Sequence, residues 1–395
     1  MRRLQRQARL PAGAIRALQW ERLQQLLRHA YQEVPFYRRK FDIAGIRPSD
    51  IRCLDDLARV PLTVRSELQD ARPEDRIART CNIDDLMQSS TSGSTGHPVT
   101  VYNTANEFMT RMAAQMRALL MAGFRPRDRL AQIGMSRGQH RPGLHERLGL
   151  FRATKISPDE SLDEQYRQIR EFEPTILWAY PNTLQALHEH IGRPMGEWLN
   201  VRAVITSAEV LREDLRRVID DELGVERFNF YGTIEFGRIA QECTAHEGLH
   251  INTDRLIVEC LRDGRPAEPG ESGSVVVTAL NAHASPLIRY ELGDSAVLLD
   301  HSCACGCAFP LMGHPQGRLH EMVVLPSGKK ISPMLFTYGM AISNVGSQYR
   351  IIQHRKDLVE LLFVNDQEEE AVVAARIRKV INEKLDEPMQ LIIRR

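Results

Sequence analysis

The chain has 395 residues, of which 43% are hydrophobic and 26% are charged, an ordinary globular composition that predicts two or three domains. The formal net charge is +1, so nothing in the composition suggests a nucleic-acid partner. No apolar run approaches the roughly 18 residues that a membrane-spanning helix needs, and we expect a cytoplasmic protein with no membrane partner.

The first half of the chain predicts helices, followed by alternating strands and helices. Apolar residues at three- and four-residue spacing predict a helix over 14–40 that "EVPFY" (33–37) interrupts, and a second helix begins after Asn103 and Thr104. Farther on, the alternation predicts a parallel or mixed sheet covered by helices. The predicted strands are 129–135, 173–180, 201–210 and 226–232, and the helices between them are 184–191 and 211–224.

The second half predicts two smaller units. "DRLIVECLRDGRP" and "SGSVVVTAL" are two strands around an Asp-Gly turn, which predicts an antiparallel, barrel-like subdomain. The tail predicts a small α+β unit with a helix over about 367–385 and the last strand "MQLIIRR". The Gly/Pro-marked segment 314–322 separates them. We therefore expect an α/β protein with a large domain over 1–317 and a small C-terminal α+β domain over 318–395.

One short loop raises a functional question. "SSTSGSTGHP" (89–98) is rich in glycine and hydroxyl residues, and such a loop either connects two elements or cradles phosphates through its backbone N–H groups. It is not a P-loop, because His97 stands where that motif has lysine. The composition of the loop leaves both readings open.

Three more segments follow in order and carry carboxylates. "ITSAEV" (205–210) and "FYGTIEFG" (230–237) each end a predicted strand, and "PLIRYELGDSA" (286–296) places Arg289 and Asp294 around a predicted turn. Ligands of open α/β sheets bind at the carboxyl ends of the strands. A glutamate there can hold Mg²⁺ between phosphates, and an aspartate can bind both hydroxyls of a ribose.

These four motifs, in this order, resemble those of the adenylate-forming, AMP-binding ligases, in the branch of phenylacetate–CoA ligase and related capsule-biosynthesis proteins. "TSGSTG" is close to the family's phosphate loop, "YGTIE" to its Tyr-Gly-x-Thr-Glu motif, and "IRYELGD" to its Gly-Asp motif. The resemblance implies that a carboxylic acid attacks the α-phosphate of ATP to give an acyl-adenylate. A nucleophile, usually a thiol, then displaces AMP.

The resemblance also implies a role for each matching residue. The phosphates of ATP would contact Ser92, Gly93, Ser94, Thr95 and Gly96. The adenine side would be lined by Ser207, Ala208, Glu209, Tyr231 and Gly232. Glu235 would bind Mg²⁺ with Thr233 beside it, and Asp294 would bind the ribose. Arg318 would lie at the hinge between the domains. The pocket for the acid would involve Tyr180 and Pro181.

Seven cysteines, an odd number, do not suggest a disulfide framework. Three thiolates and one imidazole at Cys-x6-His and Cys-x-Cys spacing suit a closed structural Zn²⁺ site, formed by Cys243, His250, Cys303 and Cys305. His246 is an alternative to His250, and Cys307 is a spare ligand or a free thiol. The other reading is that these cysteines pack as small hydrophobic residues.

Two departures from the family pattern leave alternatives open. Ile234 stands where the family often has a hydroxyl residue, and no Gly-Lys segment follows the last strand to supply the lysine that the family uses during adenylation. The leading hypothesis is an AMP-forming ligase for a small carboxylic acid, with aromatic acids and amino acids as the candidates. Its acceptor would be CoA, a carrier-protein thiol or an amine. The sequence leaves open whether the chain forms a homodimer. The alternative is a nucleotide-binding protein of this fold with degenerate or no ligase activity.

Overall fold

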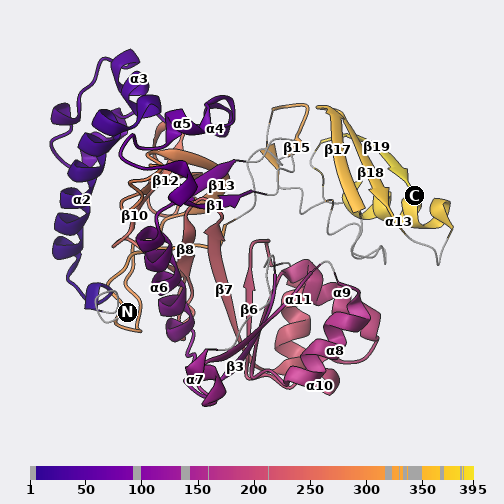
Figure 1. Cartoon of the computed structure of the whole chain (residues 1–395). Helices are drawn as coiled ribbons and strands as arrows, with labels where there is room; N and C mark the ends of the chain where they lie inside the picture. The colour runs from indigo at the N-terminus through magenta and orange to yellow at the C-terminus, as the bar shows by residue number, and fades with distance from the viewer. Residues whose placement is uncertain are drawn as a thin grey trace. The chain divides into compact units, whose positions relative to one another are not determined.

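The chain forms two compact units, Met1–Pro315 and Gln316–Arg395 (Figure 1). The structure is a computed structural model. It describes residues 6–91, 99–134, 143–158, 160–211, 213–315, 323–328, 330–331, 336, 349–364, 369–382, 385 and 387–395.

Two helices open the first unit, α2 (Ala12–Glu33) and α3 (Pro35–Ile43). The break predicted at "EVPFY" is confirmed. Val34 has an extended backbone, and Pro35 occupies the first turn of α3, where its missing N–H loses no hydrogen bond. Short helical segments follow: η1 (Pro48–Asp50), η2 (Asp55–Arg59), α4 (Arg65–Asp70), α5 (Pro73–Arg76) and η3 (Ile83–Asp85).

An antiparallel hairpin holds the two ends of the Ser/Gly/Thr loop. Its strands are β1 (Met87–Ser90) and β2 (Thr100–Asn103). Beyond them, the Thr91 N–H donates to the Val99 carbonyl at 3.0 Å, and the Val99 N–H donates to Thr91 Oγ1 at 2.9 Å. The sequence does not predict this hairpin, because β1 is short, polar and mostly exposed.

The centre of the first unit is an eight-stranded mixed sheet in the order β14-β9-β8-β7-β6-β5-β3-β4. Strands β3 to β7 are parallel, and β8, β9 and β14 pair antiparallel, as the alternation of elements predicted. The edge strand β4 was not predicted, because it is short and largely polar. The strands are β3 (Arg129–Ile133), β4 (Arg152–Ile156), β5 (Ile176–Ala179), β6 (Ala203–Ser207), β7 (Glu226–Thr233), β8 (Gly237–Gln241), β9 (Leu249–Ile251) and β14 (Leu311–Met312).

Helices cover both faces of this sheet. On β5, Trp178 packs with residues of α6, whereas Leu177 and Ala179 pack with residues of α8 to α11, because successive side chains of a strand point to opposite faces. The helices are α6 (Ala105–Met121), α7 (Leu144–Arg147), α8 (Leu162–Phe172), α9 (Pro181–Ile191), α10 (Met195–Trp198) and α11 (Glu213–Val218), which a π-helical turn, η4 (Ile219–Leu223), extends.

A four-stranded antiparallel sheet shares one hydrophobic core with helix α2. Its strands are β10 (Leu256–Arg262), β11 (Arg265–Pro266), β12 (Ser272–Ala279) and β13 (Tyr290–Val297). The prediction of a turn around Arg289 and Asp294 is wrong. Asp294 lies within β13, and Arg289 precedes the strand in a buried ion pair with Glu259 (2.9 Å), so its charge is used inside the fold.

The second unit is a small α+β structure with its own core. Its three-stranded sheet packs against α13 through residues such as Leu361, Ile377 and Ile393. The elements are β15 (Val323–Val324), β16 (Lys330–Ile331), β17 (Tyr349–Arg355), β18 (Leu358–Phe363), α13 (Glu370–Asn382) and β19 (Gln390–Arg394). Among the described parts of both units, no helix has the length and apolarity needed to cross a membrane.

Candidate active site

Three of the predicted segments meet at one edge of the eight-stranded sheet. Tyr180 and Pro181 follow β5, Ser207–Glu209 end β6, and Tyr231–Glu235 end β7. Strand β6 pairs in parallel with both β5 and β7, so the three carboxyl ends lie side by side. We call these residues the carboxyl edge. It is where open α/β sheets bind ligands.

The second segment of the carboxyl edge is tied to the first by hydrogen bonds. Glu209 accepts a hydrogen bond from the Asn182 backbone N–H, in the first turn of α9, at 2.9 Å. The Trp178 indole N–H donates to Ser207 Oγ at 2.7 Å. Between them, Ala208 has a φ of 70°, which is uncommon outside glycine and marks a constrained turn.

The third segment connects the two larger sheets of the first unit. The Tyr231 hydroxyl donates to Asp294 Oδ2 at 2.7 Å. Burial, with the Asp294 charge adding to it, raises the pKa of Tyr231 well above its usual value. The structure thus brings together the residues predicted for the adenine and the ribose. A Cβ atom on Gly232 would lie 2.4 Å from the Gly237 carbonyl oxygen, so only glycine fits there.

Glu235 is buried, with 9% of its surface exposed, and two arginines hold it. Arg65 Nη1 lies 3.8 Å from Glu235 Oε1, and Arg65 Nη2 donates to Thr91 Oγ1 at 2.9 Å. Arg111 donates to the Glu235 backbone carbonyl at 3.3 Å. Arg65 therefore joins Glu235 to the base of the Ser/Gly/Thr loop. No local pattern in the sequence marks either arginine, because both pairings are long-range.

The departure at position 234 has a structural account. Thr233 Oγ1 accepts a hydrogen bond from the Phe236 N–H at 3.3 Å, so this hydroxyl closes the turn after β7. Ile234 is partly buried and packs against the main core. The predicted phosphate residues Ser92–Gly96 and the predicted hinge residue Arg318 lie outside the described residues.

The four predicted zinc ligands lie together away from the carboxyl edge. The ligand atoms of Cys243, His250, Cys303 and Cys305 are all within 4.8 Å of one another. The Cys243 and Cys303 sulfurs are 3.5 Å apart, and Cys305 Sγ is 3.3 Å from His250 Nε2. Three of the four residues are buried and Cys305 is exposed. We call these four residues the Cys/His cluster.

The surroundings of the Cys/His cluster orient its donor atoms. A carbonyl oxygen only accepts hydrogen bonds, so the 3.2 Å contact between His250 Nδ1 and the Phe309 carbonyl places the proton on Nδ1 and leaves Nε2 free to bind a metal. Burial also lowers the pKa of His250, which favours the neutral ring. The N–H groups of Ala245 and Cys307 each donate to a cysteine sulfur at 3.4 Å.

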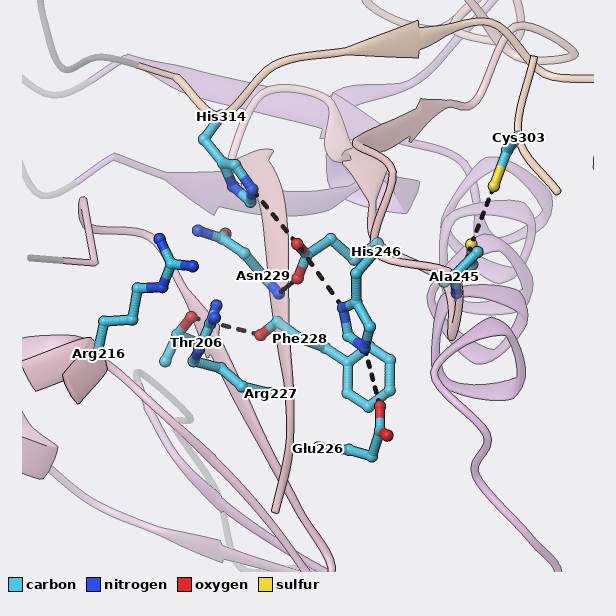
Figure 2. Close-up of polar contacts among 12 residues, drawn as sticks. Thr206, Arg216, Glu226, Arg227, Phe228, Asn229, Ala245, His246, Cys303 and His314 are labelled. Atoms are coloured by element: carbon cyan, nitrogen blue, oxygen red, sulfur yellow. Dashed lines mark hydrogen bonds and ion pairs between the residues drawn. The ribbon is translucent and has the colours of Figure 1, made fainter. Parts of the chain in front are cut away.

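The two alternative ligands point elsewhere. Figure 2 shows His246 directed toward Glu226, which its Nε2 contacts at 2.8 Å, while its ring lies against Phe228. Cys307 is partly buried and packs against the small cluster that contains Phe309. Of the two histidines weighed as ligands, the geometry therefore selects His250.

Comparison with known proteins places the chain in a family. No protein-family model matches it. It is 31% identical over 370 residues to a phenylacetate–coenzyme A ligase from Thermus thermophilus, covering 89% of this chain and 81% of that protein. It is 30% identical over 362 residues to the phenylacetate–coenzyme A ligase of Escherichia coli, covering 89% of this chain and 82% of that protein. The chain belongs to the phenylacetate–coenzyme A ligase family.

The resemblance inferred from four motifs is thereby confirmed, and with it the class of AMP-forming acid–thiol ligases. The fold agrees. A crystal structure of a 2-hydroxyisobutyryl-CoA ligase, in the postadenylation state and in complex with 2-HIB-AMP, superposes with a TM-score of 0.78 at 18% identity. The superposition covers 98% of this chain and 88% of that one.

Proposed function

We propose that this protein uses ATP and Mg²⁺ to activate a small carboxylic acid as an acyl-adenylate and passes the acyl group to coenzyme A. The observation that carries the proposal is the contact between Tyr231 and Asp294 beside the buried Glu235. Two motifs far apart in the sequence, one with Tyr231 and Glu235 and the other with Asp294, thus meet at a place suited to a nucleotide.

The proposed reaction has two steps. A carboxylate oxygen of the acid attacks the α-phosphorus of ATP, an anhydride P–O bond breaks, and pyrophosphate leaves. The thiol sulfur of coenzyme A then attacks the acyl carbon, its proton is lost to solvent, and AMP leaves. Neither step needs a covalent bond to the protein, so the protein acts by positioning and by neutralising charge.

The residues of the carboxyl edge supply that positioning. Ser92–Gly96 would hold the β- and γ-phosphates between the paired ends of the hairpin. Ser207, Ala208 and Glu209 would line one side of the adenine and Tyr231 the other. Asp294 would accept hydrogen bonds from the ribose hydroxyls, and Arg65 would add a positive charge at the base of the phosphate loop. Arg318 would sit at the hinge between the units.

Glu235 has the chemistry of a Mg²⁺ ligand. Its carboxylate is buried, and its one partner among the described side chains is Arg65 at 3.8 Å, which is too long for a direct hydrogen bond. The carboxylate oxygens therefore remain available to a hard cation. When bound, Mg²⁺ would neutralise phosphate charge. Thr233 would keep the turn that presents Glu235.

The Cys/His cluster fits a structural Zn²⁺ ion. Three sulfurs and one imidazole nitrogen are the donor set of a closed site, and the Phe309 carbonyl fixes the tautomer that such a site needs. Zinc there would join β8 and β9 to the segment around residue 304, with no part in the reaction.

The phenylacetate–coenzyme A ligases of the family favour coenzyme A as the acceptor and an aromatic acid as the substrate. A carrier-protein thiol and an amine are the other acceptors to test. Tyr180 and Pro181 would border the acid, because they follow β5 directly beside Ser207.

ATP–pyrophosphate exchange tests the proposal. The purified protein is incubated with ATP, Mg²⁺, labelled pyrophosphate and single acids from a panel of aromatic, aliphatic and amino acids. We expect label to enter ATP with at least one acid, and Asp294→Ala to abolish this exchange. ATP binding without exchange for any acid would favour a nucleotide-binding protein that lacks ligase activity.

A further inference from the structure

A buried arginine lies next to the carboxyl edge, and none of the roles above uses it. Arg238 is in β8 opposite Gly232, and only 6% of its surface is exposed. Its guanidinium carbon lies 4.4 Å from the ring centroid of Phe230 and 5.4 Å from that of Trp178. Both aromatic residues are on the sheet face that α6 covers.

The charge of Arg238 has no acidic partner among the described residues. Its Nε and Nη2 donate to the side-chain oxygen of Gln115, on α6, at 3.2 and 2.9 Å. Nη1 makes no hydrogen bond within the described chain. Burial lowers the pKa of Arg238 to about 9, and the side chain therefore remains mostly charged at neutral pH.

Two other buried arginines of the first unit form ion pairs. Arg117 pairs with Asp254 at 2.8 Å, and Arg289 pairs with Glu259 at 2.9 Å. A buried charge without a partner is costly, and Gln115 adds to the cost because its own Nε2 is buried with no acceptor. Arg238 Nη1 and Gln115 Nε2 are thus two donor groups that have no acceptor among the described residues.

These donors are connected to the place where the acid would lie. Trp178, which Arg238 overlies, donates its indole N–H to Ser207 at the end of β6, and Tyr180 follows Trp178 by two residues. A group that extends from the carboxyl edge past Ser207 toward α6 therefore approaches Arg238 and Gln115.

We propose that Arg238, supported by Gln115, selects acids that carry a second acceptor oxygen, a carboxylate or a hydroxyl, remote from the carboxylate that is adenylated. This inference rests on the proposed function and names its substrate class. The planar guanidinium binds such oxygens through paired N–H donors. An acid without the second oxygen leaves the donors unpaired and buried, which a binding site discriminates against strongly.

Exchange rates with matched acids test the inference. The probes are phenylacetate, 4-hydroxyphenylacetate and 4-carboxyphenylacetate, with butanoate and glutarate as an aliphatic pair. We expect the wild-type protein to prefer one substituted acid over its unsubstituted partner by at least about 100-fold in kcat/KM. Comparing 4-hydroxyphenylacetate with 4-carboxyphenylacetate shows whether the second acceptor oxygen belongs to a hydroxyl or to a carboxylate.

Arg238→Met removes the charge at similar volume. We expect it to lower kcat/KM for the preferred acid by at least about 100-fold. The kcat/KM for the unsubstituted acid should stay within about threefold of the wild-type value. Arg238→Lys, which keeps the charge but loses the paired donors, should fall between. Arg129→Met is the matched control, because Arg129 begins β3 at the opposite end of the same sheet, and it should leave the preference unchanged.

Equal losses for substituted and unsubstituted acids in Arg238→Met would mean that Arg238 only packs in the core, and would overturn the inference. So would a wild-type protein that exchanges with acids but shows no preference for a second oxygen, an outcome that leaves the proposed function standing. No exchange with any acid contradicts the proposed function itself. If Arg238→Met does not fold, the inference is tested by the preference of the wild-type protein for a substituted acid and by the partial loss of that preference in Arg238→Lys.

Discussion

The Cys/His cluster takes its four residues from two short segments, 243–250 and 303–305, and three of the four are buried. The carboxyl edge, by contrast, gathers residues from strands spread between Tyr180 and Glu235, and it meets Asp294 from a different sheet. The cluster is a closed, local arrangement suited to holding the fold. The edge is assembled by tertiary structure and is suited to binding. Changes to the first should cost stability, and changes to the second should cost activity in an intact fold.

The largest effect is expected from breaking the Cys/His cluster. Cys303→Ala should reduce bound zinc from about one equivalent to near zero. It should lower the melting temperature by roughly 5–10 °C, because a structural metal contributes folding free energy. Metal analysis and thermal unfolding measure the two effects. Cys260→Ala is the control, since Cys260 is equally buried but lies in β10 outside the cluster. Full zinc content in Cys303→Ala would contradict the metal site.

The next largest effect is expected at Glu235. Glu235→Gln keeps the size of the side chain but removes the charge proposed for Mg²⁺. We expect the exchange rate to fall by about 100-fold or more and the melting temperature to stay close to the wild-type value. Raising the Mg²⁺ concentration should restore part of the rate. A variant with normal exchange would show that Glu235 does not hold the metal ion.

A smaller effect is expected from a conservative change at Asp294. Asp294→Asn replaces a charged acceptor of the ribose hydroxyls by a neutral one, and should raise KM for ATP by about tenfold or more. Glu291→Gln is the matched control on the same strand, because Glu291 accepts a hydrogen bond from Ser274 and not from Tyr231. Equal KM values for ATP in the two variants would mean that Asp294 does not bind the nucleotide.

The smallest effect is a dependence of stability on alkaline pH. The pKa of Tyr231 is raised in the folded protein, so the native state keeps a proton that the unfolded state releases near pH 10. The native state then binds more protons, and the free energy of unfolding should fall as pH rises above about 10. Tyr231→Phe should show a shallower fall in denaturant unfolding. Identical slopes would mean that Tyr231 ionises normally.

Local patterns in the sequence predicted much of this structure. The break before Pro35 and the alternation from β3 to β7 depend on residues close in sequence, and so does the spacing of the Cys/His cluster. The hairpin β1–β2 was missed because its strands are polar. The turn predicted around Arg289 and Asp294 was wrong because the segment that carries Asp294 forms strand β13. Arg65 could not be predicted, since its contacts to Glu235 and Thr91 exist only after folding.

The most direct test of the central claim is mass spectrometry of the adenylation reaction. The wild-type protein is incubated with ATP, Mg²⁺ and a mixture of carboxylic and amino acids, without coenzyme A, and the quenched products are searched for acyl-AMP. We predict one acyl-adenylate in the wild-type reaction and none with Asp294→Ala. ATP that stays intact with every acid, in a protein shown to bind ATP, would contradict the account.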